Sequence, residues 1–342
     1  MTLTQIGYAI GLLFIVPLGD LIENRRLVLS ALMVTLVALL IAASSSIAWI
    51  FLTASFLIGI GSVAVQVLVP YAAHLTPEAQ RGRAVGNVMT GLALGIMLAR
   101  PIASGIADLW GWHAVFVLAA VAMAILIVVL ARNLPPRRPT ARVGYLALLR
   151  SMGRLLLDTT TLRRRAIYHA FLFASFSLFW TTVPLLLAGP AFRLSHGGIA
   201  LFALVGVAGA IAAPIAGRVA DRGWTRPATI AAMLTVAASF AISYAATSGS
   251  MAALVALGSC AVLLDLGVAA NLVLGQRAIY VLSAEYRSRL NGLYMAMFFV
   301  GGAVGSVLGA WCYAVGGWHL ATVLGGIAPL LALAYFATER AR

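Results

Sequence analysis

Long apolar stretches separated by short polar breaks dominate the pattern of this chain. The stretches run for about 16–24 residues, and the breaks between them carry arginine, glycine or proline. A helix of that length crosses the ~30 Å hydrocarbon layer of a bilayer. The pattern therefore predicts an all-α membrane protein. The eleven predicted transmembrane helices are 5–19, 27–44, 47–70, 84–106, 113–131, 166–188, 198–217, 227–247, 252–274, 291–313 and 318–337.

Composition supports this class and excludes several others. Of the 342 residues, 63% are hydrophobic and 9% are charged, whereas soluble domains carry about 25% charged residues. The net charge of +14 comes from arginine, because the chain has no lysine. Enzymes that need a P-loop lysine or a Schiff-base lysine are therefore excluded. The arginines lie at the ends of apolar stretches, where charge sets membrane orientation, so we expect no nucleic-acid partner.

The arginines also orient the predicted helices. With eleven spans, 21 of the 23 arginines fall in connections on one side of the membrane. Arg193 lies on the opposite side, and Arg100 lies inside a span. Because arginine-rich loops face the cytoplasm, we expect a multi-pass protein with a cytoplasmic C-terminus.

One connection, 132–165, is longer than the others. Three prolines between residues 135 and 139 prevent a continuous helix at its start. From about Val143 to Asp158, arginines recur every four residues opposite apolar side chains, which predicts an amphipathic helix on the cytoplasmic surface. The chain is thus expected to comprise an N-terminal bundle of five spans (1–131), a cytoplasmic linker (132–165) and a C-terminal six-helix bundle (166–342).

The two halves share a repeated pattern, which indicates a tandem duplication. Asp20 and Arg25 recur 201 residues later as Asp221 and Arg226. A second series recurs after 206 residues. Its pairs are Arg81/Arg287, Arg83/Arg289, Gly86/Gly292, Met89/Met295, Gly95/Gly301 and Gly111-Trp112-His113 with Gly317-Trp318-His319.

The segment G-R-V-A-D-R-G-W-T-R at 217–226 resembles G-x-x-x-D-R-x-G-R-R, the signature between the second and third helices of each half in the major facilitator superfamily. The first-half copy is degenerate, with Val16 in place of the leading glycine and Leu21 in place of the arginine. The resemblance implies a two-bundle secondary active transporter of the bacterial inner membrane, similar to sugar- and drug-efflux permeases. Because the family has six helices per half, it also implies that the first family helix is absent here.

The same resemblance implies a cytoplasmic gate. In the family, the signature aspartate faces the positive N-terminal end of a helix in the other half. Asp20 would then face the start of 291–313 and latch the cytoplasmic side shut in the outward-open state. The alternative is a solvated charge at a helix end. The implied gate residues are Asp20, Arg25, Arg83, Gly86, Asp221, Arg222, Arg226, Arg289 and Gly292.

Three residues are candidates for substrate binding or coupling. Arg100 lies about 9 Å from the outer end of 84–106, and Asp265 lies near the middle of 252–274. Burying either charge is costly unless it is paired or faces water. The resemblance makes both spans cavity-lining helices, while a structural role is the alternative for each residue. Trp180 is the third candidate, although the aromatic residues of 166–188 also fit a lipid-facing belt.

Two further features favour structural roles. His169 lies about one turn from the inner edge of its span, which favours interfacial packing over a proton relay. Gly301, Gly305 and Gly309 recur every four residues, the spacing at which small residues let helices approach closely.

These observations favour a secondary transporter that exports small organic molecules, sugars or drugs, by proton-coupled alternating access. Uptake or facilitated diffusion of a metabolite is an alternative within transport. A non-transporting membrane scaffold or truncated remnant is an alternative of another class. No metalloprotease or serine-hydrolase motif occurs, and the histidines lack metal-ligand spacing, so we expect no enzyme activity, metal or other cofactor. The expected partners are substrate, protons and the lipid bilayer, and we expect a monomer.

Overall fold

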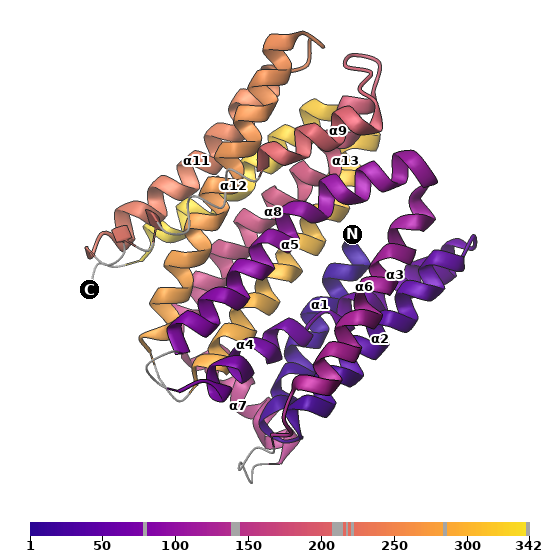
Figure 1. Cartoon of the computed structure of the whole chain (residues 1–342). Coiled ribbons are helices and arrows are strands. Elements are labelled where there is room, and N and C mark those ends of the chain that lie inside the picture. The colour runs from indigo at the N-terminus through magenta and orange to yellow at the C-terminus, as the bar shows by residue number, and fades with distance from the viewer. Residues whose placement is uncertain are drawn as a thin grey trace. The chain divides into compact units, whose positions relative to one another are not determined.

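The computed structural model is helical throughout the part of the chain that it describes. It describes residues 1–77, 81–137, 144–206, 215–216, 218–219, 222–282 and 286–339. In chain order its elements are α1 (Thr2–Phe14), η1 (Val16–Asp20), α2 (Asn24–Ser44), α3 (Ala48–Gly61), α4 (Ala64–Leu75), α5 (Arg81–Trp110), α6 (Trp112–Asn133), α7 (Tyr145–Asp158), α8 (Thr160–Ala188), α9 (His196–Leu204), α11 (Thr225–Ala245), α12 (Met251–Tyr280) and α13 (Arg287–Ala337) (Figure 1).

The predicted all-α membrane fold is confirmed. Among the described residues, eight helical segments are long and apolar enough to cross a membrane. Each predicted span coincides with a helix, except for the part of 198–217 that lies outside the described residues. The last two spans meet in α13 at Gly317, whose φ of 63° and ψ of −156° interrupt the helix.

Two predicted spans are less regular than expected. The first continues beyond α1 as the short 3₁₀ helix η1, which begins beside Pro17, a residue with no N–H to donate to an α-helix. The span 47–70 divides into α3 and α4 at Ser62 and Val63. Ser62 donates its hydroxyl to the Ile58 carbonyl, a bond that tends to bend helices.

The predicted linker helix is observed as α7, which buries part of its apolar face. Leu148 and Met152 are buried, whereas Leu146 is 69% exposed. The side chains of Arg150 and Arg154 are exposed, as expected for the polar face. Tyr145, the first residue of α7, donates its hydroxyl to the Phe14 carbonyl at 2.8 Å, which ties the linker helix to the end of α1.

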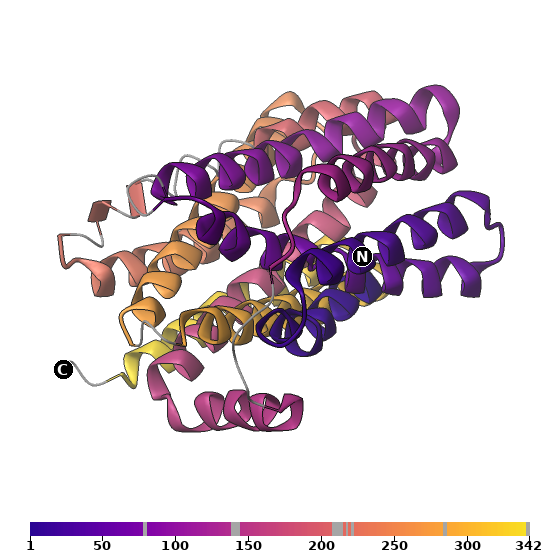
Figure 2. The ribbon, with the colours of Figure 1, turned by 60° about the horizontal axis from the view of Figure 1, so that its bottom comes forward.

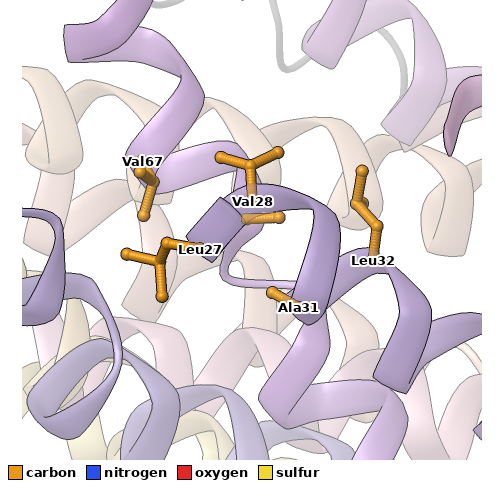
Figure 3. Packing of buried hydrophobic residues seen from close by; sticks show 6 residues of the cluster. Leu27, Val28, Ala31, Leu32 and Val67 are labelled. Carbon is orange, nitrogen blue, oxygen red and sulfur yellow. The ribbon is translucent and has the colours of Figure 1, made fainter. Parts of the chain in front are cut away.

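The described chain forms two compact units. The first contains residues 3–158 with 288–296, and the second contains 159–287 with 297–342. In the first unit, α2 packs against both α3 and α6. A core cluster forms around the start of α2, where Leu27, Val28, Ala31 and Leu32 meet Val67 of α4 (Figure 3). In the second unit, α12 packs against both α11 and α8 (Figures 1 and 2).

The two units repeat the same helix crossing, which supports the duplication predicted from the sequence. A Cβ added at Gly61 would lie 2.5 Å from the Ala31 carbonyl oxygen. At Gly267, 206 residues later, it would lie 2.8 Å from the carbonyl oxygen of Ala232, which follows Ala31 by 201 residues. Gly111 and Gly317, the glycines of the repeated Gly-Trp-His motif, both have positive φ. The sequence offsets therefore correspond to matching positions in space.

The glycine row of α13 packs as predicted. Cβ atoms added at Gly301 and Gly305 would lie 2.2 and 2.0 Å from the carbonyl oxygens of Ala170 and Ala174 on α8. At Gly309 the added Cβ would lie 3.1 Å from the Cα of Leu178. Because larger side chains would collide with backbone atoms, these glycines allow α8 and α13 to touch within the second unit.

Candidate substrate site and charge cluster

A carboxylate and an indole from distant parts of the sequence meet inside the second unit. Trp180 on α8 donates its Nε1 hydrogen to Oδ1 of Asp265 on α12, at 3.0 Å. The Trp180 side chain is buried, so it does not belong to a lipid-facing belt. Two of the three candidate substrate or coupling residues are therefore neighbours.

A glycine makes room for this pair. A Cβ added at Gly206 would lie 2.7 Å from Oδ2 of Asp265 and 2.8 Å from Cζ2 of Trp180. Both distances are below normal van der Waals contact, so any side chain at position 206 would displace the carboxylate or the indole. Sequence reasoning did not single out Gly206, because a glycine in an apolar span has many possible roles.

An apolar cavity of about 550 Å³ lies between α9 and α12 of the same unit. Ser259 supplies the one polar side chain in its lining. The lining residues are Leu194, Gly198, Leu201, Phe202, Val205, Met251, Leu254, Val255, Gly258, Ser259 and Val262.

Trp180 and Asp265 are not part of this lining, but two of the lining elements lead towards them. On α12 the lining positions follow one helical stripe, and Asp265 is the next position of that stripe after Val262. Phe202 lines the cavity, and its ring centroid lies 6.3 Å from that of Trp180. An apolar molecule in the cavity would thus approach a carboxylate and two aromatic rings.

A second buried polar pair joins α8 to α12. Nδ1 of His169 and Nδ2 of Asn271 are 3.0 Å apart, and both side chains are essentially fully buried. The His169 ring also stacks on Phe298, with centroids 4.6 Å apart. His169 therefore packs inside the second unit, between α8, α12 and α13. Asn271 was missed by sequence reasoning, although an amide two turns beyond Asp265 in an apolar span is a usable signal.

Within the first unit, Asp20 lies beside the start of α13. Nε of Arg289 is 3.8 Å from Oδ2 of Asp20, and these side chains are 21% and 46% exposed, respectively. Nη1 of Arg289 also donates to Oγ of Ser151 on α7, at 3.4 Å. A Cβ added at Gly292 would lie 3.9 Å from the Leu12 carbonyl oxygen. A partly exposed ion pair of this kind contributes at most about 1 kcal/mol.

The repeated arginines Arg25 and Arg226 hold helix ends. Nη2 of Arg25 donates to the Ala131 carbonyl in the last turn of α6. Nη2 of Arg226 donates to the Glu339 carbonyl, just beyond α13, at 2.9 Å. A cation near a helix C-terminus satisfies carbonyls that lack intrahelical partners. These carbonyl contacts were not anticipated from the sequence.

For the remaining predicted gate residues and Arg100, the structure describes the backbone or the exposure at most. Asp221 lies outside the described residues, and so do the side chains of Arg83 and Arg100. The backbones of these two residues and of Gly86 belong to α5. Arg222 is exposed in the turn before α11.

Two repeated helical units with membrane-spanning helices define a polytopic membrane protein of the duplicated transporter class, and the second unit holds both an intrahelical carboxylate and an apolar cavity. A family model described as the Major Facilitator Superfamily matches residues 1–263 and, separately, residues 166–342. The chain belongs to this superfamily, and it is a transporter by family rather than an enzyme.

Its relatives include bacterial transporters. The chain is 38% identical over 333 residues to the uncharacterized transporter YgaY of Escherichia coli O157:H7, an alignment that covers 97% of this chain and 84% of the relative. It is 31% identical over 318 residues to the probable transporter SCO4007 of Streptomyces coelicolor, covering 93% and 73%. The chloramphenicol efflux pump Rv0191 of Mycobacterium tuberculosis is 27% identical over 281 residues, covering 79% and 64%.

Solved structures share the fold. A point mutant of the nucleoside transporter NupG superposes with a TM-score of 0.76 at 14% identity, covering 99% of this chain and 90% of that one. The human organic anion transporter MFSD10 gives a TM-score of 0.68 at 18% identity, covering 98% and 83%. At these identities the likeness concerns the fold alone.

Proposed function

We propose that this transporter exports small, mainly apolar organic molecules by proton-coupled alternating access. The observation that carries the proposal is the apolar cavity whose lining on α12 stops at Val262, one helical turn before Asp265, the carboxylate that accepts from Trp180. A sugar site needs many hydrogen-bonding side chains for its hydroxyls, since unpaired buried polar groups are costly. In this lining, Ser259 supplies the one hydrogen-bonding side chain. The cavity therefore favours drug-like molecules over sugars, and the likeness to a chloramphenicol efflux pump supports that direction.

Asp265 is our candidate for the coupling residue. A carboxyl group inside a transmembrane helix can take up and release a proton, and its charge then changes the cost of keeping the site closed to water. Trp180 would orient the carboxylate through Oδ1. Arg100 stays a candidate from the sequence for the same central site.

Asp20 and Arg289 are our candidates for a weak cytoplasmic latch. Their 3.8 Å separation joins a residue of the first half to the beginning of α13. A contribution of at most about 1 kcal/mol suits a contact that must break and re-form in each transport cycle. The arginine-rich connections support a cytoplasmic location for this cluster in a bacterial inner membrane.

Flux through proteoliposomes tests the proposal. Radiolabelled chloramphenicol serves as the probe, with a pH gradient across the vesicle membrane. Asp265→Asn keeps the size and can still accept from Trp180, but it cannot titrate, so we expect gradient-driven flux to fall at least about tenfold with folding retained. Gly206→Ala should impair flux similarly because its Cβ collides with the pair. Ser259→Ala, which changes the lining without touching the carboxylate, is the matched control.

The outcomes separate the alternatives. Wild-type flux that ignores the gradient would indicate facilitated diffusion. Gradient-driven flux in Asp265→Asn at the wild-type rate would remove this residue from coupling. A folded wild-type protein that moves no member of a panel of apolar, sugar and nucleoside probes would favour a scaffold.

A further inference from the structure

A second cavity, of about 770 Å³, lies in the first unit where α2 begins and the chain leaves α6. Its lining residues are Glu23, Arg25, Arg26, Leu29 and Pro136. The backbone closes one side, because the Asn24 N–H donates to the Arg137 carbonyl at 3.0 Å. Arg25 closes another through its bond to the Ala131 carbonyl of α6. None of these contacts involves the apolar cavity of the second unit.

The charges of this cavity are placed unfavourably for an isolated helix. Arg25 and Arg26 occupy the first turn of α2, which contains no acidic residue. The N-terminal turn of a helix carries partial positive charge and favours anions, so two cations there repel the helix dipole. Glu23 offsets this in part, with Oε2 3.1 Å from Nε of Arg26. The Arg26 side chain is nevertheless 78% exposed, and the lining has a net positive charge.

The cavity also has apolar lining residues, which place it relative to the lipid bilayer. Leu29 lies one turn along α2 from Arg25 and Arg26, and Pro136 faces it from the other chain segment. Its neighbours on α2, Leu27, Val28, Ala31 and Leu32, belong to the buried core cluster (Figure 3). The cavity thus lies where an apolar span meets its arginine-rich connection, which is the level of lipid headgroups.

We propose that this cavity binds the phosphodiester headgroup of an anionic phospholipid such as phosphatidylglycerol. The phosphate accepts hydrogen bonds from Arg26 and Arg25, and the lipid's glycerol and upper acyl carbons contact Leu29. Basic pockets between transmembrane helices recognise anionic headgroups in this way. The bound anion offsets the positive charge at the start of α2, and it fastens that end of α2 to the end of α6.

Native mass spectrometry of the purified full chain in detergent tests the assignment, with titration of phosphatidylglycerol or phosphatidylcholine. We expect the wild type to prefer phosphatidylglycerol. Arg26→Gln should weaken its retention about fivefold, because one headgroup contact by arginine is worth about that factor. Glu23→Gln removes the one acidic side chain of the lining and should strengthen retention by a similar factor. Arg150→Gln, an exposed arginine of α7 outside the cavity, should leave it unchanged.

The opposite signs of the two cavity variants keep the test decisive. A variant that merely unfolds would lose lipid in both cases, and its melting temperature would reveal this. Equal retention of both lipids, or an equal loss in Arg26→Gln and Arg150→Gln, would overturn the site. Displacement of phosphatidylglycerol by millimolar inorganic phosphate would show that the cavity recognises free phosphate instead of a lipid.

Discussion

The two units differ where a repeated pair of helices crosses, α1 with α3 in the first unit and α9 with α12 in the second. In the first, a Cβ added at Gly59 of α3 would lie 2.1 Å from the Thr4 carbonyl oxygen of α1, so the two backbones touch. The residues at the corresponding offsets in the second unit are Asp265 and Val205. There α12 carries a carboxylate bonded to Trp180, and the preceding turns of α12 line an apolar cavity with Val205.

This difference indicates how duplication and function combine. The crossing of Gly61 over Ala31 recurs as Gly267 over Ala232, so the scaffold of each unit is kept. Two residues before Gly61 stands Gly59, which lets α3 touch α1. Two residues before Gly267 stands Asp265. A symmetric repeat can supply stability in both halves, whereas a buried charge is costly and needs only one location. We therefore propose that substrate binding and proton coupling belong to the second unit's copy of this repeat.

Gly59→Ala gives the largest expected effect on stability. Its Cβ meets a carbonyl oxygen of the backbone, which cannot turn aside as a side chain can. We expect a loss of about 3 kcal/mol, measured as a lower melting temperature in detergent. Gly91→Ala on α5 is the matched control, because its added Cβ meets no described atom within 4 Å. Equal melting temperatures for the two variants would show that the first crossing is not closed by backbone contact.

Asn271→Val converts the second unit to the first-unit pattern, since Val65 stands 206 residues earlier. The change removes the amide that contacts Nδ1 of buried His169. A buried polar atom that loses its partner costs about 1–3 kcal/mol, so we expect a loss of about 2 kcal/mol. The double variant Asn271→Val/His169→Phe removes both polar groups and should recover much of the stability, measured by the same melting experiment. An additive loss in the double variant would contradict this pairing.

The sequence supports the fold better than the site. The spans follow from apolar length and arginine placement, which are local properties of the chain. Asp265 and Trp180 each stand out by residue type, but their contact joins positions 85 apart and depends on how α8 crosses α12. Gly206 and the apolar lining of the cavity carry no distinctive chemistry, so their role emerges only from packing.

The details that the sequence does not predict have the same origin. Phe298 and Asn271, which contact His169, are distant in the sequence, so its burial does not follow from its position along the span. The break between α3 and α4 falls at Ser62 and Val63, and the apolar length of the span does not indicate it. The bonds from Arg25 and Arg226 to distant helix ends follow from tertiary placement, although the repeat marked both residues.

The smallest expected effect concerns Asp20→Asn in the charge cluster of the first unit. Removing the carboxylate breaks its pair with Arg289 and leaves the Ser151 contact. A partly exposed pair is worth at most about 1 kcal/mol, so the balance between outward-open and inward-open forms should shift by about fivefold or less towards inward-open. Labelling from outside of a single cysteine that is accessible only in the outward-open form should therefore become slower, with the melting temperature nearly unchanged.

Two matched variants turn this small effect into a comparison of the halves. Ser151→Ala removes a neutral partner of Arg289 and should slow labelling less than Asp20→Asn, because the 3.4 Å bond from the guanidinium to a hydroxyl lacks the second charge of an ion pair. Asp221→Asn changes the second copy of the signature. A labelling rate equal to that of Asp20→Asn would give both copies the same latch function, whereas a wild-type rate would confine the latch to the first half. Wild-type labelling in Asp20→Asn itself would reduce Asp20 to a solvated helix end.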